Sequence, residues 1–174
     1  MKVLVAVDMQ NDFVGGSLGS PEARRIVSAV VEKIAKFDGM VIATKDTHTP
    51  GYPQTQEGRI LPVPHCIKGT EGWNLVNNLE RMLETPPIEK PTFGSVELGK
   101  MLAEYNKVVP ITELTLIGLC TDVCVISNAL LLKAFLPEAR IAVDASCCAG
   151  TTPEKHVMAL NAMRACQIFI ENER

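Results

Sequence analysis

The sequence predicts an α/β protein in which a parallel sheet is covered on both faces by helices. Apolar runs at residues 2–7, 40–44 and 114–119 have the length and the aliphatic content of buried parallel strands. Segments with helical spacing of apolar residues separate these runs, and such an alternation is typical of a parallel sheet. Acidic residues follow several of the runs, where open α/β sheets bind their ligands.

Each element has its own signal in the chain. Pro21 marks the first turn of a helix, Pro91 keeps the residue before it extended, and Pro137 ends a helix. A long polar loop is expected from the end of the second strand through Arg59. In chain order we expect a strand at 2–7, a helix at 21–37, a strand at 40–44, a helix at 74–83, an extended segment at 88–93, a helix at 96–105, a strand at 114–119, a helix ending near 135, a strand at 139–143, a helix at 153–165 and a strand at 167–170.

Composition limits the class of protein. A chain of 174 residues without an evident linker or repeat suits a single domain, which we expect over residues 1–174. The net charge of −3 gives no reason to expect a nucleic acid or a membrane surface as partner. The first apolar run ends at Asp8, too early for a signal peptide, and no stretch is long enough to span a bilayer. A cytoplasmic location is therefore expected.

Among the six cysteines, Cys124 has the most suggestive position. The spacing of the six indicates neither a disulfide scaffold nor a zinc knuckle, so most should be reduced and buried. Cys124 falls in the first turn of a helix that directly follows the strand at 114–119, with Thr121 as the expected N-cap. The helix dipole there would lower the pKa of the thiol, and backbone N–H groups could bind an oxyanion. The alternative is that Cys124 is only a small buried residue.

Three unlike groups at strand ends or edges could form a site for covalent catalysis. They are Asp8, Lys90 and Cys124. A thiol needs a base to take its proton, which Asp8 could supply, and the charge of Lys90 would favour the ionised forms of both. An Asp–Lys ion pair is also a common structural feature, so the residues alone leave both interpretations open.

A second set of residues has the chemistry of a metal site. Asp46 and His48 are two residues apart, His65 stands in a loop stiffened by prolines, and Glu57 lies between them as a candidate fourth ligand. A carboxylate with two imidazoles suits zinc, and also iron or manganese. Each of these residues taken alone is more often a surface or turn residue than a metal ligand. The remaining histidine, His156, is expected to be structural.

Four segments together resemble the isochorismatase-like cysteine hydrolase superfamily, and within it the nicotinamidases. They are VAVDMQNDF at 5–13, TKDTH at 44–48, PHCIKGT at 64–70 and GLCTDVCV at 118–125. The resemblance covers nearly the whole chain. It implies a three-layer α/β/α sandwich around a mostly parallel sheet of about six strands, and it makes self-association into a homo-oligomer a fair expectation.

The resemblance also implies roles for individual residues. Asp8 matches the general base, Lys90 the lysine and Cys124 the nucleophile of the family, while Asp46, His48, His65 and in some members Glu57 match metal ligands. The peptide bond before Cys120 is implied to be cis, and the N–H groups of Cys120 and Cys124 to bind the oxyanion. Phe13 matches an aromatic residue that stacks on the substrate ring.

The chain departs from the nicotinamidase pattern at aromatic positions. Thr47 stands where a tryptophan is common, Leu61 and Pro62 stand where an aromatic residue is frequent, and Trp73 is the only tryptophan. The intact metal motif counts against an isochorismatase proper. The resemblance thus implies a metal-dependent cysteine amidohydrolase with nicotinamide as the leading small-molecule amide. The alternatives are another small amide, a vinyl ether, or a non-catalytic metal-binding scaffold.

Overall fold

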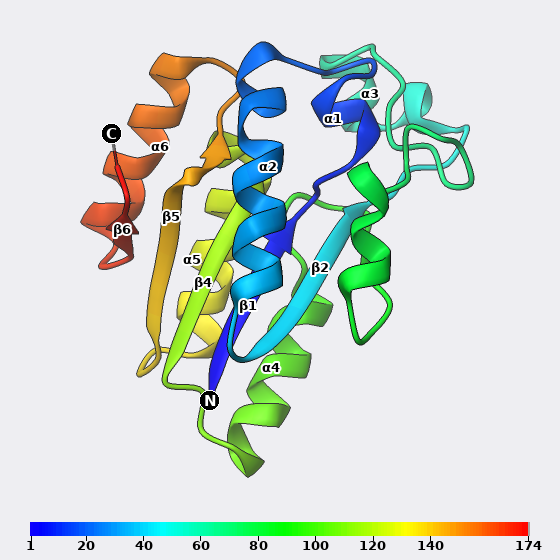
Figure 1. Ribbon diagram of the computed structural model, residues 1–174. Helices are drawn as coiled ribbons and strands as arrows, with labels where there is room; N and C mark the ends of the chain where they lie inside the picture. The colour runs from blue at the N-terminus through cyan, green and yellow to red at the C-terminus, as the bar shows by residue number, and fades with distance from the viewer. Residues whose placement is uncertain (174) are drawn as a thin grey trace.

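A wholly parallel sheet of six strands runs through the centre of the molecule (Figure 1). The computed structural model describes residues 1–173. The strands lie in the order β3-β2-β1-β4-β5-β6. Their bounds are β1 Lys2–Val7, β2 Met40–Asp46, β3 Ile88–Lys90, β4 Glu113–Leu119, β5 Arg140–Ala149 and β6 Phe169–Glu171.

Helices cover both faces of this sheet, which confirms the expected three-layer α/β/α sandwich. One face packs against α2, and the other packs against α4, α5 and α6. The α-helices are α1 Asn11–Val14, α2 Pro21–Lys36, α3 Gln56–Ile60, α4 Val96–Val108, α5 Ile126–Phe135 and α6 Pro153–Ala165. Shorter helical turns are η1 Tyr52–Gln54, η2 Val76–Met82 and η3 Thr121–Val125, the last of them π-helical.

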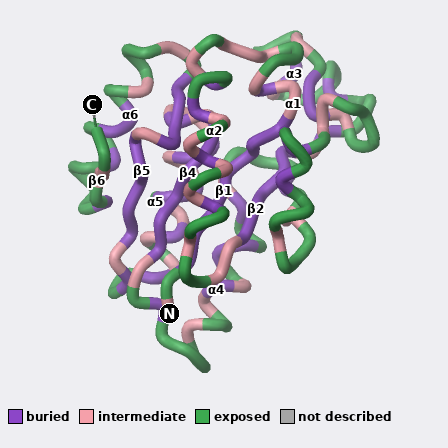
Figure 2. The backbone as a smooth tube through the Cα atoms, viewed as in Figure 1, coloured by how far each residue is buried: buried purple, intermediate pink, exposed green. Residues whose placement is uncertain are grey.

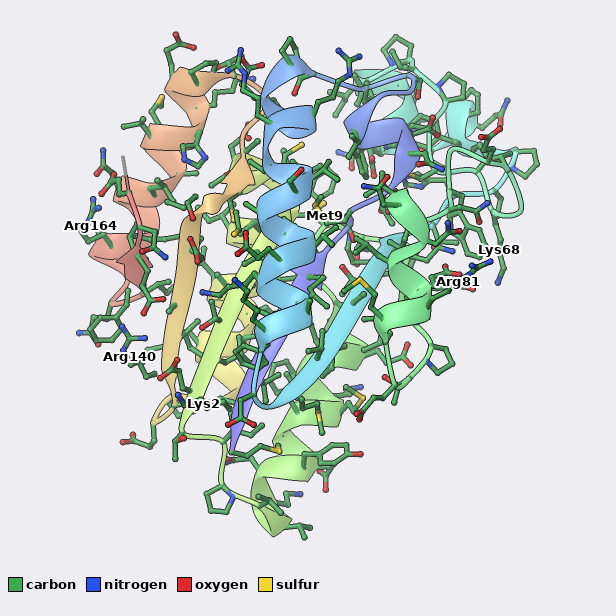
Figure 3. The ribbon with its side chains drawn as sticks, in the orientation of Figure 1. Lys2, Met9, Lys68, Arg81, Arg140 and Arg164 are labelled. Atoms are coloured by element: carbon green, nitrogen blue, oxygen red, sulfur yellow. The ribbon has the colours of Figure 1, made fainter. Side chains whose placement is uncertain are left out.

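The strands read as continuous apolar runs because both of their faces are buried. In β1, Val3, Val5 and Val7 face one core, while Leu4 and Ala6 face the other. Figure 2 shows the strands buried along most of their length and the helices exposed on their outer sides. Figure 3 shows labelled charged side chains such as those of Arg164 and Lys68 at the periphery, whereas Met9 lies inside.

Several element predictions need correction. The expected helix at 74–83 is the 3₁₀ segment η2, interrupted where Asn77 and Asn78 take left-handed φ values of 49° and 53°, which asparagine tolerates well. The loop expected through Arg59 contains η1 and α3, whose start is capped by the Thr55 hydroxyl. The strand expected at 139–143 continues to Ala149, and α1 was not predicted.

The strand order brings the predicted site residues to one edge of the sheet. From β1 the chain first adds β2 and β3 on one side, then crosses to β4 on the other, so the carboxyl end of β1 is the topological switch point where such sheets bind ligands. Asp8 follows β1 directly at this point. In the parallel register, Asp46 pairs with Lys90, and Val7 pairs with Gly118.

Gly118 makes the close approach of β4 to the end of β1 possible. Its φ is +115°, and a Cβ atom there would lie 2.1 Å from the carbonyl oxygen of Val7. Only glycine fits such a position without strain.

No helix among the described residues has the length and apolar character needed to cross a bilayer. All six cysteines are free thiols.

Candidate active site

The ammonium group of Lys90 lies at the centre of a buried polar site. Its Nζ is 2.6 Å from Asp8 Oδ2, 3.5 Å from Asp46 Oδ1 and 3.5 Å from Cys124 Sγ, and it donates a hydrogen bond to the Thr92 carbonyl at 3.1 Å. The Lys90 residue is only 1% exposed. The structure therefore brings together the three residues predicted for covalent catalysis. It also links them to the predicted metal set through Asp46, a contact that the sequence pattern did not indicate.

Asp8 is held in an unusual backbone conformation at the end of β1. Its φ is +47°, a left-handed value that is uncommon outside glycine and is tolerated by aspartate. The carboxylate is fully buried, and its Oδ1 accepts a hydrogen bond from the Thr44 hydroxyl at 2.6 Å. Burial raises the pKa of Asp8 above its ordinary value, although Lys90 opposes this rise. A carboxylate with a raised pKa is suited to take up and return a proton near neutral pH.

Cys124 lies in the π-helical turn η3, immediately before α5. It is 4% exposed, and its Sγ lies 3.5 Å from the Lys90 Nζ, the same ammonium that contacts Asp8. Burial, together with the negative charge of Asp8, raises the pKa of Cys124 well above its ordinary value, and Lys90 only partly offsets this. The expected lowering of this pKa was therefore wrong. At neutral pH the resting group is a thiol, which must lose its proton to a neighbouring base when it reacts.

The start of this turn also differs from the prediction. Cys120, not Thr121, is the N-cap residue, and no side chain caps the turn. The Thr121 hydroxyl instead pairs with Nδ1 of His156 in α6 at 2.7 Å, so that His156 fastens the turn that carries Cys124. The peptide bond between Leu119 and Cys120 is cis, as the resemblance implied. Burial raises the pKa of the Cys120 thiol to about 12.

Asp46, His48 and His65 form a compact buried cluster with the donors of a metal site. Their ligand atoms lie within 4.8 Å of one another, and His48 Nε2 is 3.0 Å from Asp46 Oδ2. His48 Nε2 has no hydrogen bond of acceptable geometry among the described residues, although it is buried. A buried imidazole nitrogen without such a partner, beside a carboxylate and a second imidazole, fits a divalent metal ion.

Contacts with neighbouring groups orient the ligand residues of this cluster. Nδ1 of His65 lies 2.8 Å from the Val63 carbonyl, so Nδ1 carries the proton and Nε2 is free to bind an ion. Burial alone would raise the pKa of Asp46, but the adjacent His48 and His65 and the charge of Lys90 outweigh it and hold that pKa below its usual range. Asp46 therefore remains an anionic ligand.

Glu57 lies beside the two histidines, but less tightly than Asp46 does. Its Oε1 is 3.6 Å from His48 Nε2 and 3.9 Å from His65 Nε2, and its side chain is 25% exposed. Because Glu57 lies in the first turn of α3, its backbone has regular structure, which the loop prediction did not anticipate. The position allows it to serve as an additional ligand.

Two residues near the metal cluster were missed by sequence reasoning. Tyr52 is buried against both imidazoles, with ring centroids 4.6 Å from His48 and 4.9 Å from His65, and its hydroxyl donates to the Leu61 carbonyl. Gln10 bonds to the backbone of Asp46 twice, with Nε2 donating to its carbonyl and Oε1 accepting from its N–H. The signal for Tyr52 was an aromatic residue inside a polar, Pro- and Gly-rich loop.

Phe13, predicted to stack on the substrate, lies next to the metal cluster. It belongs to α1, is buried, and its ring centroid is 5.5 Å from that of His65. Its neighbour Asp12 accepts a hydrogen bond from the N–H of Cys66, the residue after His65. The segment after β1 is thus fastened to the loop that carries the second histidine, which leaves Phe13 at the edge of the site.

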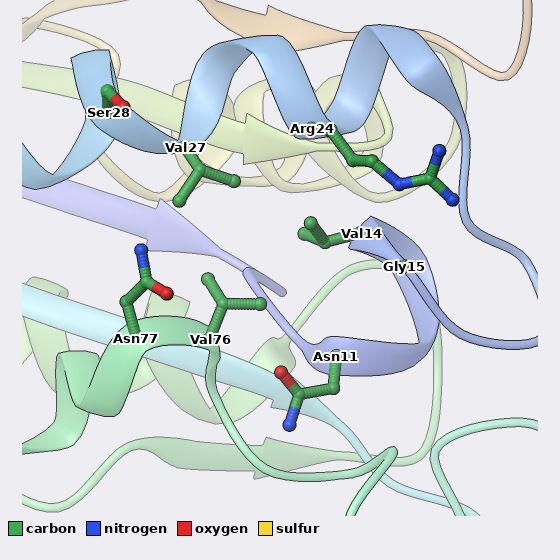
Figure 4. A pocket seen from close by; sticks show the side chains of 8 residues that line it. All are labelled: Asn11, Val14, Gly15, Arg24, Val27, Ser28, Val76 and Asn77. Atoms are coloured by element: carbon green, nitrogen blue, oxygen red, sulfur yellow. The ribbon is translucent and has the colours of Figure 1, made fainter.

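A surface hollow of about 520 Å³ lies apart from these residues. It is formed between α1, α2 and η2, and Figure 4 shows side chains from all three elements around it. The guanidinium of Arg24 extends away from the other labelled side chains (Figure 4). None of the residues that line this hollow belongs to the metal cluster or to the group around Lys90.

Comparison with known proteins agrees with this geometry. The family described as the isochorismatase domain matches residues 2–173. The chain belongs to the isochorismatase family. A nicotinamidase/pyrazinamidase from Mycobacterium tuberculosis is 30% identical and covers 97% of each chain.

Two solved structures place the chain among the nicotinamidase-like members of this family. The crystal structure of a nicotinamidase from Bacillus subtilis matches with a TM-score of 0.79 at 30% identity, over 98% of this chain and 99% of that one. A pyrazinamidase from Pyrococcus horikoshii in complex with zinc matches with a TM-score of 0.77 at 26% identity, over 97% of each chain. The likeness extends along the whole sandwich and is not confined to one motif.

The first prediction concerns the metal cluster. We expect His48→Ala to weaken zinc retention by at least about tenfold, because it removes one of three clustered donors. Glu57→Gln should weaken retention less, since Glu57 is partly exposed and lies farther from the histidines. Bound metal measured by mass spectrometry after dialysis against a competing chelator tests this. His156→Ala is the matched control and should retain metal like the parent. Equal retention by His48→Ala and the parent would contradict the assignment.

Proposed function

We propose that this protein is a cysteine amidohydrolase that converts nicotinamide to nicotinate and ammonia. The observation that carries the proposal is that one buried ammonium, Lys90, contacts Asp8, Cys124 and Asp46 at once. A base, a thiol and a candidate metal site therefore share one position at the switch point of the sheet. The relatives that are named nicotinamidases support the choice of an amide C–N bond as the target.

The proposed reaction begins with a proton transfer. Asp8 takes the proton of the Cys124 thiol, so that the S–H electron pair remains on sulfur while sulfur attacks the amide carbonyl carbon. The charge of Lys90 stabilises the anionic sulfur before attack and the Asp8 carboxylate at rest. The N–H groups of Cys120 and Cys124 are proposed to hold the oxyanion that forms on the carbonyl oxygen.

Collapse of this intermediate breaks the C–N bond. Asp8 returns the proton to the leaving nitrogen, which departs as ammonia and leaves the acyl group on sulfur as a thioester. Water, deprotonated by Asp8, then attacks the thioester carbon and releases the carboxylic acid. The proton returns to sulfur, so that the thiol and the carboxylate regain their starting forms.

The metal cluster contributes to substrate binding in this proposal. A divalent ion held by Asp46, His48 and His65, with zinc as the leading candidate, would supply a Lewis-acid position for a ring nitrogen or for a water molecule. The chain's own residues set the orientation: Tyr52 packs against both imidazoles, and Phe13 lies beside His65. A ring bound here would have Phe13 as its aromatic neighbour.

A different small amide is the second candidate substrate. The positions of Thr47, Leu61 and Pro62 carry no aromatic side chain, and the indole of Trp73 is already engaged, with Nε1 donating to Thr47 and the Lys45 ammonium 3.1 Å from the ring centroid. Trp73 therefore does not supply the missing aromatic residue. A site without aromatic side chains at these positions would be less selective for a flat ring.

The second prediction separates the two cysteines of the turn. Cys124→Ala should lower ammonia release by at least about a thousandfold, as loss of a nucleophile does, while the fold remains intact. Cys120→Ala should keep most of the activity, because only its backbone N–H is used. Steady-state rates, together with circular dichroism of both variants, measure this. The reverse order of activities would show that Cys124 is not the nucleophile.

The third prediction tests the substrate and the metal together. Nicotinamide should release ammonia, benzamide should be poor because it lacks the ring nitrogen, and chelation should abolish the reaction with nicotinamide. Added zinc, iron or manganese should restore it. A panel with other small amides, assayed for ammonia, shows whether another substrate is preferred. Bound metal without ammonia release from any amide would favour the non-catalytic scaffold instead.

A further inference from the structure

Thr44 is a fully buried threonine near the carboxyl end of β2. Side chains alternate along a strand, so Thr44 faces the same side as Ile42, which belongs to the core cluster that also contains Val7 and Cys124. A valine of nearly the same shape would fill this place without burying a hydroxyl. Burying a hydroxyl is costly unless it is hydrogen-bonded.

Both hydrogen bonds of this hydroxyl involve a single residue, Asp8. The Asp8 N–H donates to Thr44 Oγ1 at 3.3 Å, and Thr44 Oγ1 donates to Asp8 Oδ1 at 2.6 Å. Because Oγ1 accepts from the backbone, and a carboxylate oxygen only accepts, the hydroxyl proton is directed at Oδ1. The Thr44 side chain thus holds both the backbone and the carboxylate of Asp8, at the residue whose φ is +47°.

The second carboxylate oxygen of Asp8 has a different environment. Oδ2 lies 2.6 Å from the Lys90 Nζ, yet it is a buried atom without a hydrogen bond of acceptable geometry among residues 1–173. The hydrogen bond that Thr44 donates to Oδ1 disfavours rotation of the carboxylate. Oδ2 is on the side of Lys90, whose ammonium also contacts Cys124 Sγ, so Oδ2 is the better placed of the two oxygens to take the proton of Cys124.

We propose that Thr44 is a positioning residue that fixes the Asp8 carboxylate so that Oδ2 alone exchanges the proton with Cys124. In that step the S–H bond breaks, its electron pair stays on sulfur, and an O–H bond forms at Oδ2; the same proton later leaves on ammonia. The inference rests on the proposed function, in which Asp8 is the base for Cys124. It adds a residue that acts through Asp8 and does not touch the substrate.

Three variants at Thr44 test this proposal, with nicotinamide as substrate. Thr44→Val keeps the shape and removes the hydroxyl, and it should lower kcat about ten- to a hundredfold with KM changed less than about threefold, because alignment and not binding is lost. Thr44→Ser keeps the hydroxyl and should restore kcat to within about threefold of the parent. If Thr44→Val does not fold, Thr44→Ala takes its place. Bound metal should be unchanged in all variants, which excludes an indirect effect through Asp46.

Thr115→Val is the matched control, because Thr115 is also a buried strand threonine and is in β4. It should leave kcat within about twofold of the parent. A kcat for Thr44→Val equal to that of the parent, an equal loss in Thr115→Val, or failure of Thr44→Ser to recover would each overturn the proposal.

A readout without substrate separates this proposal from the proposed function. The rate of iodoacetamide alkylation at Cys124, followed by mass spectrometry of the peptide, depends on deprotonation by Asp8 and not on any amide substrate. It should fall about five- to tenfold in Thr44→Val, while the rate at the exposed Cys166 stays constant. If the parent protein shows no amidase activity but alkylation of its Cys124 still slows in Thr44→Val, only the proposed reaction is refuted. An unchanged Cys124 rate in Thr44→Val refutes the role of Thr44.

Discussion

One buried ammonium, that of Lys90, is the interaction on which the site depends. It is shared by two carboxylates and a thiol, all of them almost completely removed from water. Burying unpaired carboxylates is unfavourable, and removal of one partner from such a buried group costs about 3–5 kcal/mol. Lys90 therefore both permits two anionic residues to lie side by side and favours ionisation of the thiol. Because its Asp46 contact reaches the candidate metal cluster, the two halves of the site are coupled by a single charge.

The sheet provides the framework for this arrangement. The pairing of β2 with β3 places Lys90 beside Asp46, and the closeness of β1 and β4 allowed by Gly118 brings the turn of Cys124 toward Asp8. The polar contacts of Thr44 and Gln10 then fix the ends of the first two strands against each other. The strained left-handed backbone of Asp8 is held in place by these hydrogen bonds. Such strain is often found at functional sites.

Much of this could be predicted from the sequence, because the relevant signals are local. Buried parallel strands are apolar throughout, so the Asp8 and Asp46 carboxylates at their ends stand out. The missed features depend on three-dimensional packing: Thr44 and Tyr52 belong to the site only through their neighbours. The pKa of Cys124 was predicted in the wrong direction. The sequence shows only that the thiol lies at the start of a helix, where the dipole lowers the pKa, whereas burial and the nearby charge of Asp8, which raise it, become visible only in the folded structure. The break at Asn77 and Asn78 reflects backbone conformations that apolar spacing does not reveal.

The pH dependence of Cys124 alkylation in Lys90→Met tests the central role of this ammonium most directly. Because Lys90 lowers the pKa of a thiol that burial raises, its loss should raise that pKa and move the rise in alkylation to higher pH. We predict a rate at Cys124 at least about tenfold below that of the parent at pH 8, since one pKa unit corresponds to a tenfold change in thiolate. Lys33→Met, which removes the ion pair with Asp144 away from the site, is the control and should leave the profile unchanged. An unaltered profile in Lys90→Met would contradict the account.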